Sequence, residues 1–472
     1  MVKRSGTIRS PFEIALLGLL ALGAGAGSGV ADEPFLYAVE FVSTAAFGSA
    51  MNDAGVVAGT AYTDPGCGST CLPPVEPVVW QNGARTVLPI PAGFSTVIVR
   101  GINASGWLAG FAGDVSVGSR AVVWKPVAGG YEGIVLEGPP GTTMSAAIGI
   151  DELGRVVGYS TSPNLSPFQW TEADGVVDLA ALGFPNEVPL FVSPGGAVAT
   201  PSHWYDLDDA GSTLTLAPPP PGFSGPGSYP AAVNDTGDQA RFQISTSTEF
   251  LPYLFRYDPQ GTWQQIWSLP AGHLAPFGIG SITNGGDLTA TVGGIGLIAY
   301  GPSRSAQPLA GKLSPAYGAG DVTVAGPING VGEILAQVMI GRSTRLVRLV
   351  PATECTDGCV RASSIEMSGA MIGRPRGQCT ESAFNRVTAT ISVTDESGTP
   401  LRGVSVRGRF LDDYWTDAPF AGATNRLGRV KFVHTGPACV GAVAFLVDDA
   451  ASPGRSLDRT TGQLTSYVIP RP

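Results

Sequence analysis

The stretch Asn52-Asp53-Ala54-Gly55-Val56-Val57-Ala58-Gly59 decides the fold, because copies of it return along the chain. Each copy has a polar residue, often Asx, then a glycine three positions later, then small and apolar residues. Clear copies lie at 103–110 and 151–158, and weaker ones at 193–199, 234–237, 283–288 and 329–336. The aligned glycines have a mean spacing of about 46 residues, and they are Gly55, Gly106, Gly154, Gly196, Gly237, Gly286 and Gly332.

The chemistry of this cassette is that of a hairpin turn. An Asx side chain accepts hydrogen bonds from the turn backbone, and glycine takes the position with positive φ. A second apolar strand, often ending in an aromatic residue, follows about 20 residues later in most copies. Its clear examples are Pro77–Trp80, Ala121–Trp124, Pro167–Trp170 and Tyr253–Phe255.

Four short strands in a repeat of about 46 residues match the size of one propeller blade. The sequence therefore predicts an all-β fold with a β-propeller over residues 32–350. Seven copies predict six or seven blades, because strands from both chain ends can close one blade. A β-solenoid is the alternative architecture.

The cassettes resemble the bacterial extracellular HAF repeat family, whose units read I-N-x-x-G-x-V-V-G. The resemblance covers residues of about 36–350 and is best in the first three units. The family's His-Ala-Phe triplet is absent here, since the strands that end in an aromatic residue occupy its places. The resemblance implies an extracellular, propeller-like protein and no particular activity.

The repeat stops after Val350, and a second domain is predicted at 363–472 after a linker at 351–362. Two segments, 393–406 and 424–432, resemble bacterial Ig-like surface domains, which implies a β-sandwich. The expected strands are Val387–Thr394, Gly403–Leu411, Arg429–Val433, Ala442–Val447 and Leu464–Ile469.

The N-terminal segment has the pattern of a secretory signal peptide. Lys3, Arg4 and Arg9 precede an apolar run at 14–22, and small residues lead to a predicted cleavage after Ala31. An N-terminal membrane anchor is the alternative, but the apolar run is shorter than the roughly 20 residues that span a bilayer. We expect a secreted or cell-surface protein, or a periplasmic one, without membrane insertion after cleavage.

Six cysteines agree with export, because disulfides persist in oxidising compartments. Their proximity in the sequence predicts the pairs Cys67–Cys71, Cys355–Cys359 and Cys379–Cys439, although six cysteines allow 15 pairings. The two C-x3-C pairs are alternatively metal ligands. A zinc site needs four ligands, however, and His203, His273 and His434 are few and scattered.

The sequence contains no motif that predicts catalysis or a cofactor. Gly294–Ala299 fits the dinucleotide pattern G-x-G-x-x-A, but Tyr300-Gly301-Pro302 follows in place of a helix, so a strand is expected. Asp206–Gly211 resembles a calcium loop, yet Ala210 stands where an oxygen ligand is required. We predict no catalytic residues, no metal site and no cofactor, and we assign no binding residues.

Charge and aromatic content limit the partners. Residues 32–360 have a net charge of −15 and residues 361–472 of +3, so nucleic acid is an unfavourable ligand. Neutral glycans and proteins remain as candidate ligands. Seven tryptophans either stack on sugars at the propeller mouth or pack between blades, and they are Trp80, Trp107, Trp124, Trp170, Trp204, Trp263 and Trp267.

Together these features favour an exported, non-enzymatic binding or adhesion scaffold that recognises an extracellular glycan or protein. One alternative is a carbohydrate-active enzyme, a hydrolase or lyase, with acids at the propeller centre. A structural component of the cell surface or matrix is the other. The fold by itself does not choose among them.

Overall fold

Among the residues that the structure describes, the fold consists of β-strands and three single-turn 3₁₀ helices. It comes from a computed structural model that describes residues 36–43, 46–62, 75–114, 118–162, 164–215, 223, 230–244, 252–259, 262–268, 277–301, 304–318, 320–340, 343–370, 384–412, 419–440 and 442–469. The chain divides into units 1–34 and 35–472, and every described residue belongs to the second. The predicted signal peptide, residues 1–31, therefore lies outside the described residues.

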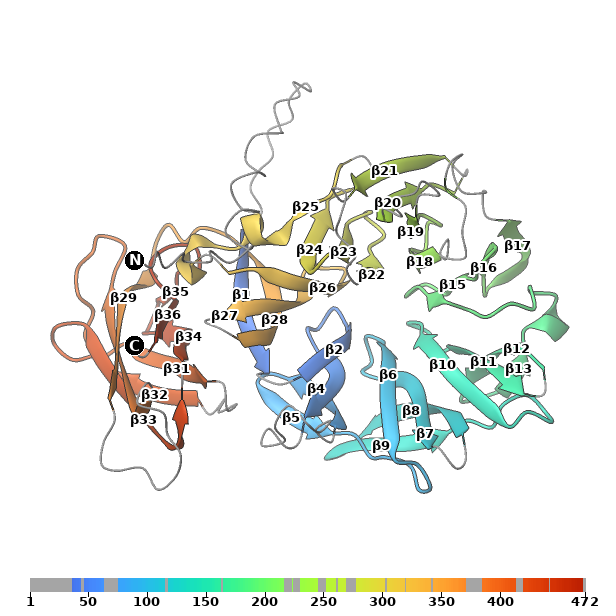
Figure 1. The fold of residues 1–472 in the computed structure, drawn as a ribbon, viewed down its shortest axis with the longest axis horizontal. Helices are drawn as coiled ribbons and strands as arrows, with labels where there is room; N and C mark the ends of the chain where they lie inside the picture. Colours follow the sequence, from blue (N-terminus) through green and yellow to red (C-terminus); the bar gives the residue numbers. More distant parts are fainter. Residues whose placement is uncertain are drawn as a thin grey trace, which may run out of the picture. The chain divides into compact units, whose positions relative to one another are not determined.

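Residues 36–352 form seven four-stranded antiparallel sheets, here called ring sheets 1 to 7 (Figure 1). Ring sheet 1 contains β2 (Ala46–Met51), β3 (Val57–Tyr62), β4 (Val75–Gln81) and β5 (Ala84–Val87). Ring sheet 2 contains β6 (Thr96–Ile102), β7 (Leu108–Asp114), β8 (Gly118–Val127) and β9 (Gly130–Val135). Ring sheet 3 contains β10 (Met144–Ile150), β11 (Val156–Ser162), β12 (Ser166–Thr171) and β13 (Gly175–Asp178), followed by the 3₁₀ turn η1 (Ala180–Leu182).

The next three sheets repeat this order. Ring sheet 4 contains β14 (Phe191–Val192), β15 (Ala197–Ala199), β16 (His203–Asp206) and β17 (Asp209–Thr215). Ring sheet 5 contains β18 (Pro230–Val233), β19 (Gln239–Ile244), β20 (Pro252–Tyr257) and β21 (Trp263–Ser268). Ring sheet 6 contains β22 (Phe277–Ile282), β23 (Leu288–Val292), β24 (Ile295–Ala299) and β25 (Gln307–Pro308), followed by η2 (Leu309–Lys312) and η3 (Pro315–Tyr317).

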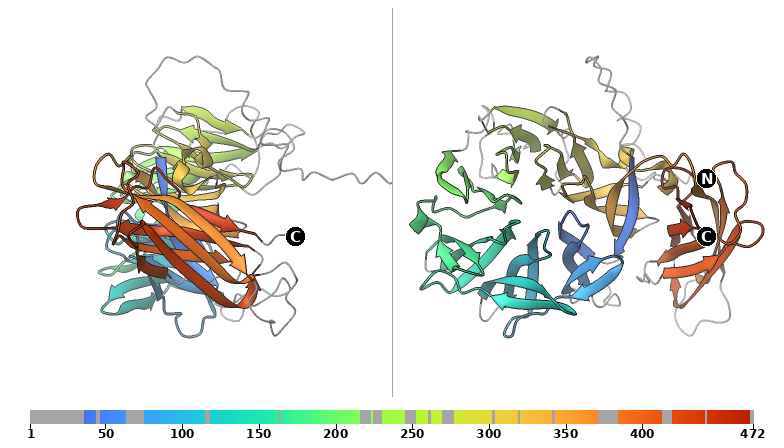
Figure 2. Two further views of the ribbon diagram at one scale, coloured as in Figure 1. Left: turned by 90° about the vertical axis from the view of Figure 1, so that its left-hand side faces the viewer. Right: turned by 180° about the vertical axis from the view of Figure 1, so that it is seen from behind.

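Ring sheet 7 joins the two ends of the repeat region. Its strands β26 (Val322–Ile328), β27 (Ile334–Ile340) and β28 (Ser343–Ala352) are completed by β1 (Leu36–Ser43), which pairs antiparallel with β28. Figures 1 and 2 show β1, in blue, beside β28 at the outer side of this sheet. The strand that begins the described chain thus completes the sheet that ends the repeats.

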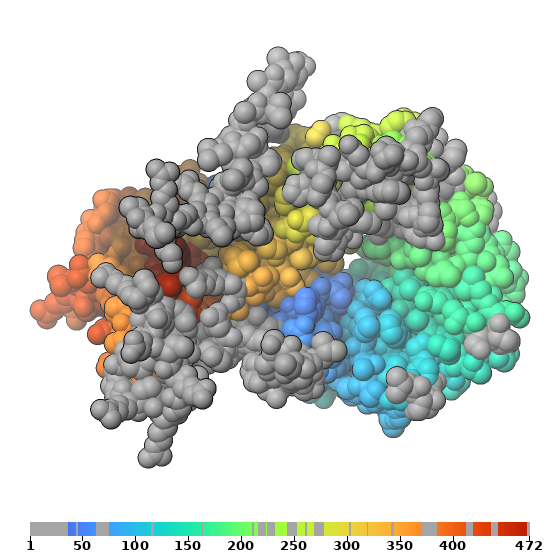
Figure 3. All heavy atoms as spheres, in the orientation of Figure 1, coloured from blue at the N-terminus to red at the C-terminus, as the bar shows by residue number. Residues whose placement is uncertain are grey.

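The first strands of successive ring sheets contact one another in a closed cycle. β2 contacts β6, the contacts continue through β10, β14, β18 and β22 to β26, and β26 contacts β2. Apolar side chains pack between neighbouring sheets, and Figure 3 shows the first three ring sheets, blue to green, packed against one another. The all-β prediction is confirmed, and this cyclic order of four-stranded sheets is the arrangement that a β-propeller requires.

The cassettes form the turns between the first and second strands of the ring sheets, as predicted. All seven aligned glycines have positive φ, from 69° at Gly55 to 97° at Gly196. In the first cassette the Asn52 side-chain oxygen accepts hydrogen bonds from the N–H groups of Ala54, at 3.1 Å, and Val56, at 3.0 Å. The Asx side chain therefore replaces partners that the turn backbone lacks.

The same asparagines also join neighbouring ring sheets. The Asn52 amide donates to the Asn103 carbonyl at 3.0 Å, and Asn103 donates to the Asp151 carbonyl at 3.2 Å. Asn234 donates to Thr283 at 2.9 Å, and Asn329 donates to Asn52 at 3.1 Å, which closes the cycle. An aspartate, serine or threonine at this position accepts the turn N–H groups but has no amide to donate.

Gly154 allows a test of the turn conformation. Its φ is +81°, and a Cβ there would meet no atom within 4 Å, so Gly154→Ala adds backbone strain alone. We expect a loss of about 1–2 kcal/mol in the free energy of unfolding, measured by urea titration. Gly311, which has open space and no positive φ, is the matched control. Equal effects of the two alanine substitutions would contradict the prediction.

Residues 359–468 form a two-sheet unit. One sheet has the order β33-β30-β29-β35 and the other β32-β31-β34-β36, and their apolar faces share one buried cluster. The expected linker, 351–362, overlaps the end of β28 and the start of β29. The strands are β29 (Cys359–Ala370), β30 (Phe384–Thr394), β31 (Ser405–Asp412), β32 (Pro419–Ala423), β33 (Arg429–Val440), β34 (Val443–Ala451), β35 (Ser456–Leu457) and β36 (Thr465–Val468).

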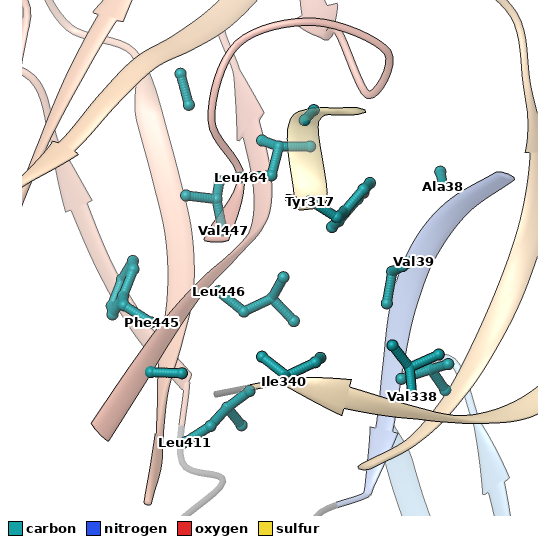
Figure 4. Packing of buried hydrophobic residues seen from close by; sticks show 14 of the residues in the cluster. Ala38, Val39, Tyr317, Val338, Ile340, Leu411, Phe445, Leu446, Val447 and Leu464 are labelled. Carbon is teal, nitrogen blue, oxygen red and sulfur yellow. The ribbon is translucent and has the colours of Figure 1, made fainter. Parts of the chain in front are cut away.

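The buried cluster of the two-sheet unit continues into ring sheet 7. Val39 and Ile340 of the ring belong to the same cluster as Leu446 and Leu464. Figure 4 shows Leu446, Ile340 and Leu411 facing a common space, with Leu464 beside Tyr317. The two parts are therefore joined by an apolar core in addition to the connecting segment between β28 and β29.

Candidate functional site

A pocket lies at the seam between ring sheet 7 and the two-sheet unit, and its volume is about 570 Å³. This volume is in the usual range for sites that hold small molecules or peptide side chains. The ring supplies Val39, Leu313, Tyr317, Gly318, Gly320, Asp321, Val338, Met339 and Ile340, and the two-sheet unit supplies Ala444, Gln463, Thr465, Ser466, Tyr467 and Ile469.

The ring side of the pocket depends on η3, which precedes β26. Pro315 occupies the first turn of η3, and the Ser314 hydroxyl accepts a hydrogen bond from the Ala316 N–H at 3.3 Å. Ser314 also donates to the Arg459 carbonyl at 2.6 Å. Local capping thus fixes this short turn and ties it to the opposite side of the pocket.

The opposite side is formed mainly by β36, and this strand and the residue before it bond η3. The Leu464 N–H donates to the Ala316 carbonyl at 2.6 Å, and the Thr465 hydroxyl donates to the Tyr317 carbonyl at 2.6 Å. The Tyr467 side chain is 62% exposed and that of Ile469 is 38% exposed. These two exposed side chains therefore stand where a ligand can contact them.

Arg459 bonds both sides near the pocket. Its guanidinium donates to the Tyr317 hydroxyl at 3.3 Å and to the Asp448 carbonyl at 2.8 Å, and it lies 4.0 Å from the Glu40 carboxylate. Burial raises the pKa of the Tyr317 hydroxyl, so this group remains a neutral donor or acceptor near neutral pH. Burial lowers the pKa of Arg459, but Tyr317 and Glu40 outweigh it and the net shift is upward.

The chemistry of the pocket lining is mostly apolar with a few polar groups. Asp321 carries the one charged side chain among the described lining residues. Gln463, Thr465, Ser466 and Tyr467 add neutral donors and acceptors. An apolar floor with few directional polar groups is typical of sites that bind ligands without transforming them, and also of many active sites.

A second polar cluster surrounds Glu187, between ring sheets 3 and 4. Its carboxylate accepts hydrogen bonds from the hydroxyls of Thr200, at 2.5 Å, and Ser202, and lies 3.1 Å from His203 Nδ1. Burial alone would raise the pKa of Glu187, but these hydrogen bonds outweigh it and lower it. The Ser202 hydroxyl donates to the Glu187 carboxylate and also lies 3.4 Å from His203 Nδ1, so the cluster ties the loop that carries Glu187 to residues 200–203.

Glu187 gives a pH prediction. Because its pKa is below the ordinary value of 4.5, its contribution to stability is present above pH 4.5 and is lost as the pH falls through the folded-state pKa. We expect Glu187→Gln to lower the free energy of unfolding at pH 7 and to lower it by less at pH 3. Denaturant titrations at the two pH values test this, and an equal effect at both would contradict it.

Acidic side chains of three cassettes bond the turn amides of neighbouring ring sheets. Asp53 accepts from the Gly330 N–H at 2.7 Å, Glu152 from Ala104 at 2.8 Å and Asp235 from Gly195 at 2.7 Å. Burial raises the pKa of Glu152, and the charges of Asp53, Asp151 and Asp235 raise it further. Negative charge is therefore concentrated at the cassette side of the ring.

The structure describes only one of the three predicted cysteine pairs completely. Cys355 and Cys359 form a disulfide with a Cα–Cα distance of 5.9 Å. Cys67, Cys71 and Cys379 lie outside the described residues, as does the side chain of Cys439. No group of three or more potential metal ligands occurs among the residues that the structure describes.

His434 and the acidic turn around Asp208 have local partners in the described part of the chain. His434 stacks on Phe410 within the two-sheet unit, and His273 is outside the described residues. The Asp206–Gly211 segment is the turn between β16 and β17, and there Asp208 pairs with Arg155. Gly294–Ala299 contains β24, a strand as expected.

The tryptophans with the least exposure pack between ring sheets. Trp80, Trp124 and Trp170 are at most 8% exposed and belong to inter-sheet clusters. Trp107 is partly buried, 6.5 Å from Trp170 between ring centroids, and the Lys125 ammonium lies over it. Packing therefore explains these four, whereas Trp263 is 43% exposed and contacts Phe255.

Sequence reasoning did not find the pocket. Its two sides come from segments more than 100 residues apart, such as Val338 and Thr465, so no local motif contains it. One segment of the pocket, Leu464–Ile469, has an apolar pattern in the sequence. That pattern predicts a strand, but it does not indicate that the strand lines a pocket. No helix among the described residues is long and apolar enough to cross a membrane.

The chain matches no protein-family model, and a comparison with curated proteins gives no match. Solved structures similar to it include β-propeller proteins. The β-propeller domain of the Trilobed protease from Pyrococcus furiosus has 11% identity and a TM-score of 0.39, covering 65% of this chain and 96% of that one. A puromycin hydrolase mutant has 14% identity and a TM-score of 0.35, covering 66% and 53%, so the chain spans about half of that protein.

A lectin is also among the similar structures. SapL1, solved with alpha methyl fucoside, has 10% identity and a TM-score of 0.28, with 66% of this chain and 98% of that chain covered. Identities and scores this low indicate a related arrangement of strands at most. The assignment of the architecture rests on the sheet order and contacts of this chain.

Proposed function

We propose that the chain is an exported, non-enzymatic binding protein, in which a seven-bladed β-propeller closed by β1 and an Ig-like sandwich share a ligand pocket. The seven ring sheets and their cyclic contacts support the blade number. The shared face of two four-stranded sheets supports the sandwich. The Cys355–Cys359 disulfide and the N-terminal segment support export.

The observation that carries the binding role is the pocket at the seam. Its sides are held by hydrogen bonds between η3 and β36, by Arg459 and by a continuous apolar core. A site built on such fixed elements is preorganised, so little conformational entropy is lost when a ligand binds. An extracellular glycan or protein remains the ligand class.

Filling the pocket tests this proposal. Ile469→Trp adds bulk at the pocket wall, and Leu427→Trp makes the same kind of change at a 68% exposed turn residue elsewhere. We expect a ligand found with neutral-glycan and peptide arrays to lose at least ten-fold in affinity with Ile469→Trp and to be unaffected by Leu427→Trp. Equal binding by both variants would remove the pocket from the proposal, and ligand turnover would contradict the non-enzymatic role.

A carbohydrate-active enzyme is the second candidate, and Glu152 is the observation that favours it. A carboxyl group with a raised pKa beside other carboxylates is suited to act as a general acid in glycoside hydrolysis. The test is release of reducing sugar from a panel of polysaccharides by the wild-type chain and by Glu152→Gln. Release that Glu152→Gln abolishes would replace the binding role, and release that it leaves intact would exclude Glu152 as the acid.

A further inference from the structure

β36 is an edge strand that lines the pocket. It is the last strand in the order β32-β31-β34-β36, and no other strand pairs with it among the described residues. Thr465, Ser466, Tyr467 and Ile469 all contribute to the pocket lining. An edge strand presents backbone donors and acceptors that another extended chain can bond.

The register identifies which backbone groups face outward. The Val447 N–H donates to the Leu464 carbonyl at 2.8 Å, and Leu446 pairs with Thr465 next along the ladder. In an antiparallel ladder, hydrogen-bonded residues alternate with residues whose backbone groups point away. Ser466 and Val468 therefore bond β34, whereas the N–H and C=O groups of Thr465 and Tyr467 point to the free edge.

These outward groups have no other partner in the part of the chain that the structure describes. No described backbone or side-chain group bonds the N–H or C=O of Thr465 or Tyr467. Proteins protect edge strands by keeping them short, by covering them, or with proline, a bulge or inward charge, and of these devices the described part of the chain gives β36 only its length of four residues. β36 has the sequence Thr-Ser-Tyr-Val and a regular register with β34.

Resting on the proposed binding function, we propose that the occupant of the pocket is an extended peptide segment of a partner protein that adds to β36 as a further strand. Two residues with outward groups, spaced two apart, match the spacing of another β-strand and give up to four main-chain hydrogen bonds. A sugar ring has no such repeat of donors and acceptors. The edge therefore favours a polypeptide over a glycan.

The side chains around the edge define the peptide chemistry. Val338, Ile340 and Ala444 offer an apolar floor to one face of the added strand. Asp321 places an exposed carboxylate at the ring side of the pocket. The segment that fits best alternates β-branched apolar residues with polar ones and carries a lysine or arginine opposite Asp321.

A blocked, fluorescein-labelled peptide Val-Lys-Val-Thr-Val-Lys-Val is the probe, and fluorescence anisotropy with the full chain is the measurement. Two further peptides carry N-methyl groups on alternate residues, one on the odd and one on the even positions. Strand addition uses the N–H groups of one alternating set only. We expect one methylated peptide to lose at least ten-fold in affinity while the other binds as the unmodified probe does.

Three protein variants test the same edge by changing the protein in place of the peptide. Tyr467→Pro removes an outward N–H but leaves the β34 bonds of Ser466 and Val468, whereas Tyr467→Ala keeps that N–H. We expect Tyr467→Pro to bind the probe at least ten-fold more weakly than Tyr467→Ala does. Asp321→Asn should weaken binding of the lysine-containing probe by about two- to five-fold and leave a probe with serine in place of lysine unchanged.

The outcomes separate this inference from the proposed function. No binding of the probe, or equal binding of both methylated peptides, overturns strand addition. A glycan that Ile469→Trp displaces keeps the pocket as the binding site but also overturns the peptide. Self-association that Tyr467→Pro abolishes assigns the edge to a second copy of the chain. If no array ligand responds to Ile469→Trp, the proposed function fails as well.

Discussion

Arg155→Val is expected to lower the free energy of unfolding by about 3 kcal/mol, because it leaves a buried carboxylate without its cation. The Asp151 side chain is fully buried and that of Arg155 is 10% exposed. The Arg155 guanidinium donates to Asp151 at 2.6 Å and also pairs with Asp208 of the next ring sheet. Urea denaturation followed by tryptophan fluorescence measures the loss.

The first cassette indicates a second substitution that should restore the stability lost in Arg155→Val. At the positions of Asp151 and Arg155, the first cassette has Asn52 and Val56. Asp151→Asn combined with Arg155→Val therefore recreates a pair that the chain already uses, including an amide that can donate to the next turn. We expect the double variant to recover to within about 1 kcal/mol of the wild type.

An exposed ion pair is the control for this prediction. Arg85 pairs with Glu76 near the surface, with side chains 43% and 24% exposed. Arg85→Ala should change the free energy of unfolding by less than about 1 kcal/mol. A double variant no more stable than Arg155→Val alone would show that the lost cation is not the cause of the damage.

Leu464→Ala is expected to destabilise ring sheet 7 and the two-sheet unit together. Leu464 is fully buried in the cluster that both parts share, and removal of its side chain should cost about 2–5 kcal/mol. Hydrogen exchange measured by mass spectrometry should show faster exchange in β27 as well as in β34. The full chain should unfold in one cooperative transition.

A buried leucine in another cluster of the ring is the matched control. Leu108 is also fully buried, in the cluster between ring sheets 1 and 2. Leu108→Ala should leave exchange in β34 unchanged. If Leu464→Ala accelerates exchange in the two-sheet unit alone, the shared core does not couple the two parts, and the unit behaves as an independent domain.

The repeat made the ring predictable because each cassette encodes its own turn. Asn52 and Gly55 set a local conformation, and the alternation after them sets the strand. The role of β1 has no such local signal, since its partner β28 lies about 300 residues away. The sequence accordingly left six and seven blades open.

The two-sheet unit was predicted less completely for a different reason. β29 was missed because Ser363, Ser364 and Gly369 interrupt its apolar pattern, and a register shift lies between Ala362 and Ser364. β32, with Pro419 and Gly422, has residues that usually mark a turn. The five predicted strands overlap β30, β31, β33, β34 and β36.

The pocket lay beyond sequence reasoning because it depends on how two parts pack. Arg459 illustrates this point. Its sequence neighbours Asp458 and Thr460 suggest a solvated turn, yet its guanidinium reaches Tyr317, 142 residues earlier. Contacts of this kind form only when ring sheet 7 and the two-sheet unit pack together. The hydropathy and spacing of the sequence therefore do not predict them.

The pairing of β1 with β28 has a consequence for synthesis. At roughly 5–20 residues per second, β28 emerges about 15–60 s after β1, because Ser43 and Ser343 are 300 residues apart. During that interval the apolar segment Leu36–Ser43 has no strand partner and is open to wrong pairing with other chains. The ring therefore cannot close before β28 is synthesised, and a chain truncated before Ser343 should be a client of chaperones rather than a smaller ring.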